Sequence, residues 1–507
     1  MAKPIMIQGT MSNAGKSILA GGLCRIFRQD GYRTAPFKSQ NMALNSFITE
    51  DGLEMGRAQV MQAEAAGTAP RVEMNPVLLK PTSDTGSQVI VNGTVRGVMP
   101  AKEYYAFKKQ LIPEIMKAYQ TLAAEYDIIV VEGAGSPAEI NLKQDDIVNM
   151  GLARMLKAPV LLVGDIDRGG VFAQLAGTLM LLEEEERQMV RGLVINKFRG
   201  DLDILKPGLQ MLEERTRCPV RGVIPYVHLD IDDEDSLSER FSSQMPKGRI
   251  DIAAVRFPRI SNFTDLNVLS CYEGVSVRYV DRPAQFGDPD LVILPGTKNT
   301  MGDLKWLMES GIAGKIQQAV SRNTPVIGIC GGYQMLGTML SDPEGVEAGD
   351  GVPVSMRGLG LLPVRTSFGT QKTRTRMEGV VTADQGFWGG LNGCRTEGYE
   401  IHMGETSLDG GQNLGRIRNM QGSDARMEGC THGSVCGTYL HGFFDSPEIS
   451  GKVAELLLRK KGLGIEDLKP VDRKAYKEEQ YDKLAKVIRE HLDMDAVYRI
   501  LEEGVSG

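Results

Sequence analysis

The sequence predicts an α/β protein with two doubly wound, mostly parallel sheets and a helical C-terminal extension. Apolar runs of strand length alternate with segments of helical periodicity, first in the N-terminal half and again after residue 249. A chain of 507 residues is also too long for one hydrophobic core. A stretch rich in Asp, Glu and Ser separates the two halves and is interpreted as a linker. The predicted units are a first domain at 1–228, a linker at 229–248, a second domain at 249–448 and a helical extension at 449–507.

Composition restricts the function classes. The chain is 42% hydrophobic and 24% charged, as is typical of a soluble globular protein. Its 58 basic and 65 acidic residues give a net charge of −7, which argues against a nucleic-acid-binding protein with a dominant basic face. No run of 18 apolar residues occurs and the N-terminus has the pattern of a strand, so we expect a cytoplasmic protein without a membrane span. Seven scattered cysteines without a CxxC pair indicate reduced thiols.

The first domain begins with a phosphate-binding pattern. A short strand at 4–8 is followed by a loop that ends in Gly15-Lys16-Ser17, and an apolar helix follows at 18–28. This is the layout of a P-loop, in which main-chain N–H groups bind phosphate, the lysine reaches the outer phosphates and the hydroxyl binds Mg²⁺. We predict ATP and Mg²⁺ as ligands, with the nucleotide held by Thr10, Ser12, Asn13, Ala14, Gly15, Lys16 and Ser17.

Polar residues follow the later strands of this domain. Glu132 ends the strand at 126–131 and is the expected acid on the metal side of the phosphates, where Asp165 or Asp167 could join it. Asp127, at the start of that strand, is interpreted as a turn or capping residue. Asn196 ends a later strand, where its amide could contact an adenine edge.

An amide-rich loop follows the second strand at the edge of the sheet where ligands bind. Lys38, Gln40 and Asn41 are therefore predicted to contact a substrate carboxylate or the transferred phosphoryl group. Arg168, between an acidic turn and two glycines, is a further candidate for an anionic substrate. An ordinary polar loop with capping residues is the alternative.

The second domain contains a nucleophile-elbow pattern. The apolar run 326–329 reads as a buried strand that ends on Cys330, and Gly331 and Gly332 open the helix that follows. Such a strained strand-to-helix turn presents one reactive side chain above the sheet, and the helix dipole favours the thiolate. A buried structural cysteine is the alternative. The segment 261–265, after the first strand of this domain, could face the other domain.

A thiolate nucleophile needs a proton shuttle, and the chain has five histidines. His228 lies in the interdomain stretch and His491 in a charged helix, so both are expected to be solvated. His441 follows the strand-like segment 434–440 and is the preferred base, with His402 as its rival. His432, in a glycine-rich turn, is the weakest candidate.

These motifs resemble a known family. The segment 328–334, preceded by 294–300 and followed by 439–442, is similar to a class I glutamine amidotransferase domain. The resemblance implies that Cys330 attacks the side-chain amide of glutamine, that His441 shuttles protons, and that main-chain N–H groups at Gly296 and Gly331 hold the oxyanion. Such domains commonly have a glutamate two residues after the histidine, where this chain has Phe443. Asp445 and Glu400 remain open as the residue that orients His441.

A phosphate site and an ammonia source in one chain imply that ATP activates a carboxylate which ammonia then amidates. The P-loop, one residue longer than the standard motif, resembles that of the dethiobiotin synthetase group. With the amidotransferase domain it resembles the cobyrinate amidase family, and the segments that carry this resemblance are 36–42, 131–142, 165–172 and 398–404.

The resemblance implies amidation of four peripheral carboxylates (b, d, e and g) of a corrinoid, adenosylcobyrinic acid a,c-diamide, with glutamine as the nitrogen donor. One alternative is a related amidase for the a and c carboxylates or for another acid. A second, of a different class, is a non-catalytic nucleotide-switched binding protein.

Overall fold

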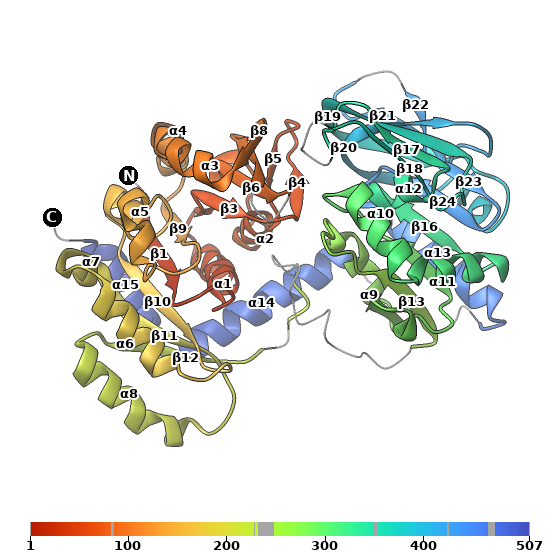
Figure 1. Cartoon of the computed structure of the whole chain (residues 1–507). Coiled ribbons are helices and arrows are strands. Elements are labelled where there is room, and N and C mark those ends of the chain that lie inside the picture. Colours follow the sequence, from red (N-terminus) through yellow and green to blue (C-terminus); the bar gives the residue numbers. More distant parts are fainter. Residues whose placement is uncertain are drawn as a thin grey trace.

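The computed structural model describes residues 2–82, 86–227, 229–231, 248–347, 352–422, 425–464 and 472–505. The predicted linker, apart from a few residues at its ends, lies outside the described residues, and so does His228. Two α/β domains lie side by side (Figure 1). No disulfide joins the seven cysteines, each of which is described. Within the described ranges, none of the helices has both the length and the apolar character needed to cross a bilayer.

The first domain is built on a six-stranded parallel sheet with the strand order β12-β11-β10-β1-β9-β2. Its strands are β1 (Lys3–Gly9), β2 (Thr34–Phe37), β9 (Ile128–Glu132), β10 (Val160–Asp165), β11 (Val190–Phe198) and β12 (Val220–Pro225). Successive side chains along β1 enter different cores, since Ile5 and Ile7 pack on one face and Met6 on the other. This period of two, with apolar side chains on both faces, is the pattern of a sheet covered on both sides by helices.

Helices cover both faces of this sheet. One face packs against α1 (Lys16–Gln29), α14 (Arg473–His491), α15 (Met494–Glu503) and part of α2 (Arg57–Ala66). The other packs against α4 (Ile112–Glu125), α5 (Met150–Leu156), α6 (Val171–Leu181), α7 (Glu184–Met189) and α8 (Leu202–Thr216). The predicted doubly wound architecture of the first domain is confirmed.

An extension of the first domain faces its neighbour. It contains the sheet β3-β6-β7-β8 and the antiparallel pair β4–β5. The elements are β3 (Gln40–Met42), β4 (Ser46–Ile48), β5 (Glu54–Gly56), β6 (Val77–Pro81), β7 (Gly86–Val91), β8 (Thr94–Pro100) and α3 (Ala101–Phe107). Figure 1 shows β4 and β5 on the side of this domain nearest to the second domain.

The second domain has a sheet with the order β14-β13-β15-β16-β24-β23, parallel except at β23. Its strands are β13 (Ile250–Val255), β14 (Val275–Val280), β15 (Leu291–Leu294), β16 (Val326–Ile329), β23 (Cys430–His432) and β24 (Val435–Thr438). The helices of the domain are α9 (Asn267–Ser270), α10 (Thr300–Glu309), α11 (Ile312–Ser321), α12 (Gly331–Leu336) and α13 (Pro447–Lys460).

A second, mostly antiparallel sheet fills the sequence between α12 and β23, where we expected the parallel sheet to continue. It is formed by β17 (Met339–Asp342), β18 (Val354–Arg357), β19 (Val364–Val381), β20 (Arg395–Leu408), β21 (Gly415–Asn419) and β22 (Arg426–Glu428). The long strands β19 and β20 alternate buried with exposed positions along parts of their length, as a sheet with one solvated face requires.

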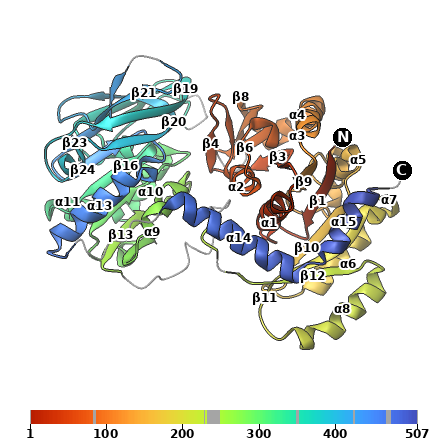
Figure 2. The ribbon, with the colours of Figure 1, turned by 180° about the vertical axis from the view of Figure 1, so that it is seen from behind.

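The C-terminal helices pack against both domains. Helix α13 contributes Val453 and Leu457 to the core of the second domain. Helix α14 then runs beneath the first domain (Figure 2), where Arg25 of α1 pairs with Glu478 at 2.7 Å. Its apolar face packs against α1 and the sheet, as the amphipathic pattern predicted.

One buried carboxylate joins the two domains. Glu54 of β5 accepts hydrogen bonds from Lys80 of β6 at 2.9 Å and from Lys372 of β19 at 2.8 Å. Burial opposes the charge on Glu54, but the two ammonium groups hold the pKa of its carboxyl well below the usual range. Burial lowers the pKa of Lys372 to about 7, although Glu54 acts in the opposite direction. The ion pair is therefore desolvated, and bulk water cannot replace the carboxylate as the partner of either lysine.

Glu54→Ala is expected to destabilise the folded chain strongly, because it removes the carboxylate to which both Lys80 and Lys372 donate in a site shielded from water. The expected loss is about 3–5 kcal/mol in the free energy of unfolding, measured by urea denaturation. Asp127→Ala serves as the control, since it removes an exposed partner of Arg33 and is expected to leave the urea midpoint nearly unchanged. Equal shifts for both variants would contradict the role assigned to Glu54.

Candidate active sites

The P-loop connects β1 to α1 as the sequence predicted. Asn13 and Gly15 have left-handed backbones, with φ of 61° and 94°, and this turns the loop back onto the helix start. The Lys16 ammonium donates to the carbonyls of Met11 at 3.0 Å and Gly135 at 3.2 Å. It is therefore held over the loop, in reach of a phosphate bound there.

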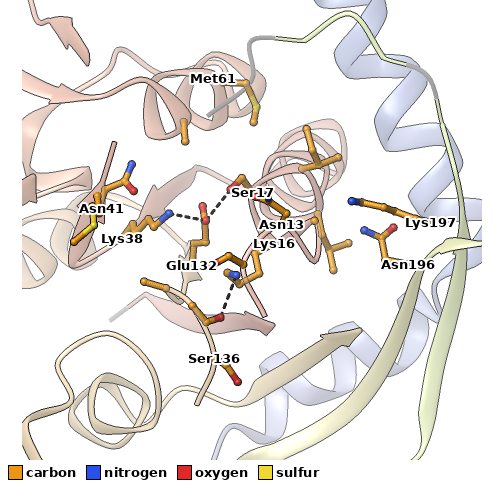
Figure 3. A pocket seen from close by; sticks show the side chains of 18 of the residues that line it. Asn13, Lys16, Ser17, Lys38, Asn41, Met61, Glu132, Ser136, Asn196 and Lys197 are labelled. Carbon is orange, nitrogen blue, oxygen red and sulfur yellow. Dashed lines mark hydrogen bonds and ion pairs between the residues drawn. The ribbon is translucent and has the colours of Figure 1, made fainter. Parts of the chain in front are cut away.

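Glu132 lies at the centre of this site (Figure 3). Its Oε1 accepts hydrogen bonds from Ser17 Oγ and from Lys38 Nζ, each at 2.8 Å. Its Oε2 accepts from the side-chain amides of Gln62 at 2.6 Å and Gln59 at 3.3 Å. Ser17 and Glu132 together offer the hard oxygen ligands that Mg²⁺ prefers, so both predicted metal residues fit such an ion.

A cavity of 1410 Å³ surrounds these groups and extends to the second domain. Among the predicted residues, it is lined by Ser12, Asn13, Gly15, Lys16, Ser17, Lys38, Gln40, Asn41, Glu132, Arg168 and Asn196. The second domain contributes Leu266 and Tyr279 to the wall, and α14 contributes Tyr476. The predicted nucleotide and substrate residues therefore meet in one space between the domains.

Some predicted residues lie behind the cavity wall. Thr10 donates to Gln174 Oε1 at 3.1 Å, and the Ala14 carbonyl accepts from the Asn196 amide at 2.9 Å. Asn196 thus braces the P-loop as well as lining the cavity. Asp165 contacts Lys197 at 3.1 Å, and Asp167 contacts Arg199 at 3.1 Å. Each of these two acids therefore already has a cationic partner.

Cys330 has the geometry of a nucleophile elbow. It lies between β16 and α12 with φ 53° and ψ −109°, a left-handed backbone that is unusual for a non-glycine residue. Glycine at 332 is required, because a Cβ there would lie 1.9 Å from the Leu294 carbonyl oxygen. Gly331 is the first residue of α12, so its N–H has no acceptor within the helix.

His441 lies next to this elbow. A Cβ at Gly296 would lie 3.1 Å from His441 Cε1, so the predicted oxyanion turn packs directly against the imidazole. The imidazole is also stacked on Tyr399, with 5.3 Å between centroids and 20° between the planes. The main chains of these two residues also exchange hydrogen bonds of 2.9 and 3.1 Å.

Asp265 orients His441, and sequence reasoning missed this. The structure places Asp265 Oδ2 2.7 Å from His441 Nδ1, and neither Asp445 nor Glu400 takes that position. Asp265 belongs to the segment 261–265, for which the sequence indicated only that it could face the other domain. Burial works against a charged ring, but the Asp265 carboxylate and the adjacent Cys330 raise the pKa of His441 to about 10. The ring is therefore an imidazolium at neutral pH.

The other histidines have different environments. His402 stacks on Tyr439 at 3.8 Å between centroids, and its Nδ1 bonds to the Gly404 carbonyl at 2.8 Å. Burial lowers the pKa of His402, so it stays neutral. His432 and His491 are exposed, at the end of β23 and of α14. Among the described histidines, His441 is the one whose ring nitrogen is hydrogen-bonded to a carboxylate, that of Asp265.

Comparison with known proteins agrees with this arrangement. Residues 5–237 match the family model described as a CobQ/CobB/MinD/ParA nucleotide binding domain, and residues 251–449 match a CobB/CobQ-like glutamine amidotransferase domain. The chain is 59% identical to the cobyric acid synthase of Ruminiclostridium cellulolyticum, over 100% of this chain and 98% of that protein. It is 57% identical to the cobyric acid synthase of Lachnoclostridium phytofermentans, over the full length of both.

Similarity to solved structures is weaker. One of them, PurLQS from Thermotoga maritima, covers 42% of this chain and 99% of its own, at 18% identity and a TM-score of 0.30. At that score the overlap adds nothing to the fold described above.

The two domains and their sites define a glutamine-dependent amidotransferase joined to a P-loop nucleotide-binding domain. The full-length identities place the chain more narrowly. It belongs to the cobyric acid synthase family.

Asp265→Asn is expected to move the alkaline limit of glutaminase activity to lower pH. Burial lowers the pKa of His441, but Asp265 and Cys330 raise it to about 10, so wild-type activity should decline only as the pH rises through that value. Without the carboxylate the ring loses its proton at lower pH, and kcat should fall by about 10²- to 10⁴-fold. The measurement is a pH profile of glutamate release.

The control for this experiment is Asp251→Asn. Asp251 is also buried and pairs with Arg278 at 2.7 Å, but it lies at the start of β13, at the opposite sheet edge from Cys330. An unchanged alkaline limit in Asp265→Asn would contradict the assignment of Asp265.

Proposed function

We propose that this protein uses ATP and glutamine to amidate the b, d, e and g carboxylates of adenosylcobyrinic acid a,c-diamide, giving adenosylcobyric acid in cobalamin biosynthesis. The observation that carries the proposal is the presence of two complete sites in one chain: Cys330 with His441 and Asp265, and the P-loop with Glu132. The cobyric acid synthase family and the interdomain cavity support the choice of a corrinoid.

In the second domain, Cys330 would attack the amide carbon of glutamine. The N–H groups of Gly296 and Gly331 would bind the oxygen of the tetrahedral intermediate. His441 would give its proton to the leaving nitrogen, which departs as ammonia and leaves a thioester. The ring would then take a proton from the water that releases glutamate, with Asp265 holding its orientation throughout.

In the first domain, the γ-phosphoryl group of ATP would pass to a corrinoid carboxylate. Lys16 and Lys38 would offset the charge on the transferred group. Ser17 and Glu132 would hold Mg²⁺, which offsets phosphate charge when it is bound. Asn41 and Arg168, on the cavity wall, would contact carboxylates of the corrinoid. Ammonia then attacks the acyl phosphate, the C–N bond forms, and inorganic phosphate leaves.

The experiment for this proposal counts amides. The full chain is incubated with ATP, Mg²⁺, glutamine and adenosylcobyrinic acid a,c-diamide, and the product is analysed by mass spectrometry. Four added amides are expected. Amidation only of a corrinoid that has free a and c carboxylates would identify the related amidase instead, and no amidation of either acid would refute the proposal.

Two variants serve as controls for the amide count. Lys16→Ala should lose amide synthesis while retaining part of the glutaminase activity, because the two sites lie in different domains. Cys330→Ser should lose glutaminase activity.

A further inference from the structure

A continuous set of buried contacts connects Glu132 in the phosphate site to His441 in the glutaminase site. We propose that residues 46–66, which include β4, β5 and α2, are a positioning element that makes glutaminase activity depend on occupancy of the phosphate site, with Tyr399 as the residue through which they act on His441. The inference rests on the proposed function, since it concerns how the release of ammonia is coupled to the activation of the carboxylate.

The element begins at the metal-side acid. Gln59 and Gln62 on α2 both donate to Glu132, and Gln62 also donates to the Ser17 carbonyl at 3.2 Å. All of these side chains except Ser17 are buried. In the part of the chain that the structure describes, Gln62 Oε1 has no hydrogen-bond partner. A cation held by Ser17 and Glu132 would compete with these amide donors for the Glu132 oxygens, so its binding would change the hydrogen bonds that hold α2.

Helix α2 is rigidly joined to the domain interface. It follows β5 without an intervening loop, and the Arg57 N–H donates to the Asn45 carbonyl at 3.3 Å. Strand β5 pairs with β4 in the register Ser46 to Gly56. A side chain at Gly56 would lie 2.7 Å from Asn41 Nδ2, so the start of the helix is closely packed. A shift of α2 is therefore transmitted to β4.

The second domain binds β4 through the partners of His441. The Ser46 N–H donates to Asn262 Oδ1 at 3.3 Å, and the Tyr399 hydroxyl donates to the Ser46 carbonyl at 3.2 Å. Asn262 Nδ2 in turn donates to that hydroxyl at 2.9 Å. Phe47 packs edge-on against the Tyr399 ring, with centroids 5.8 Å apart. Both main-chain polar groups of Ser46 are thus held by the tyrosine that stacks on His441 and by the asparagine that supports it.

These contacts give the coupling a physical route. Tyr399 contacts β4 with its hydroxyl and ring, and it contacts His441 with its ring and main chain. Because Tyr399 stacks on the His441 ring, movement of Tyr399 changes the space available to the imidazole. The two sites, although they lie in different domains, can then influence each other through the differential contacts of this element.

The test compares glutaminase rates of the full chain with and without ATP, Mg²⁺ and adenosylcobyrinic acid a,c-diamide. The wild-type rate should rise roughly tenfold, within the range typical of coupling between sites. Tyr399→Phe keeps the ring but removes the hydroxyl that contacts Ser46 and Asn262, so the stimulation should fall to about twofold or less. A merely structural role would lower both rates and leave their ratio unchanged.

Tyr272→Phe is the matched control. Tyr272 is another buried tyrosine of the second domain, and its hydroxyl bonds to Ser450 at 2.9 Å, so this variant should keep the wild-type ratio. Phe47→Leu alters the contact with the Tyr399 ring from the side of the first domain. This variant provides the test if Tyr399→Phe does not fold. It should also reduce the ratio.

Two results would overturn the inference: a wild-type enzyme whose glutaminase is not stimulated, or full stimulation in both Tyr399→Phe and Phe47→Leu. The amide count of the wild-type enzyme separates this from a failure of the proposed function. If the wild-type enzyme forms the amides but both variants keep full stimulation, only the positioning element is refuted.

Discussion

The ion pair of Glu54 with Lys80 and Lys372 fixes the two domains against each other, and both sites depend on that fixed relation. The carboxylate and both ammonium groups are withdrawn from water, so the pair loses much more by separation than an exposed salt bridge does. Glu54 lies on β5, in the same segment as the contacts of Ser46 with the second domain. The interface thus includes a desolvated charge cluster and a set of directional hydrogen bonds.

Both sites use the same property of parallel sheets. Strands β1 and β9 end at the P-loop and Glu132, and strands β15 and β16 end at the Gly296 turn and Cys330. Because side chains and N–H groups converge where parallel strands end, each sheet supplies a ligand site at its carboxyl edge. The cavity lined by both domains shows that the first of these edges opens toward the second domain.

Local motifs were predictable from the sequence, because their chemistry lies within a few consecutive residues. The P-loop and the elbow at Cys330 each consist of a strand, a turn with glycines and a helix, and the structure has both. The alternation of strands and helices likewise predicted the two parallel sheets. The antiparallel sheet from β17 to β22 was missed, since the pattern of its long strands is interrupted by the bulge between Phe368 and Thr373.

Contacts between distant segments could not be predicted. Asp265 and His441 are 176 residues apart, and Glu54 and Lys372 are 318 apart. No periodicity or spacing connects such pairs, and a lone aspartate after a strand has many possible roles. The amphipathic pattern of the C-terminal helices predicted a buried face. The sequence did not indicate that the buried face of α14 packs against α1.

Amide formation has one chemical requirement: ammonia released at Cys330 must reach the activated carboxylate before water protonates it. The direct measurement is an isotope competition, in which glutamine labelled with ¹⁵N in its amide is supplied together with excess unlabelled ammonium. If the two sites work as one shielded unit, the new amide groups carry the glutamine label despite the excess. Amide groups whose label is diluted in proportion to the ammonium present would contradict it.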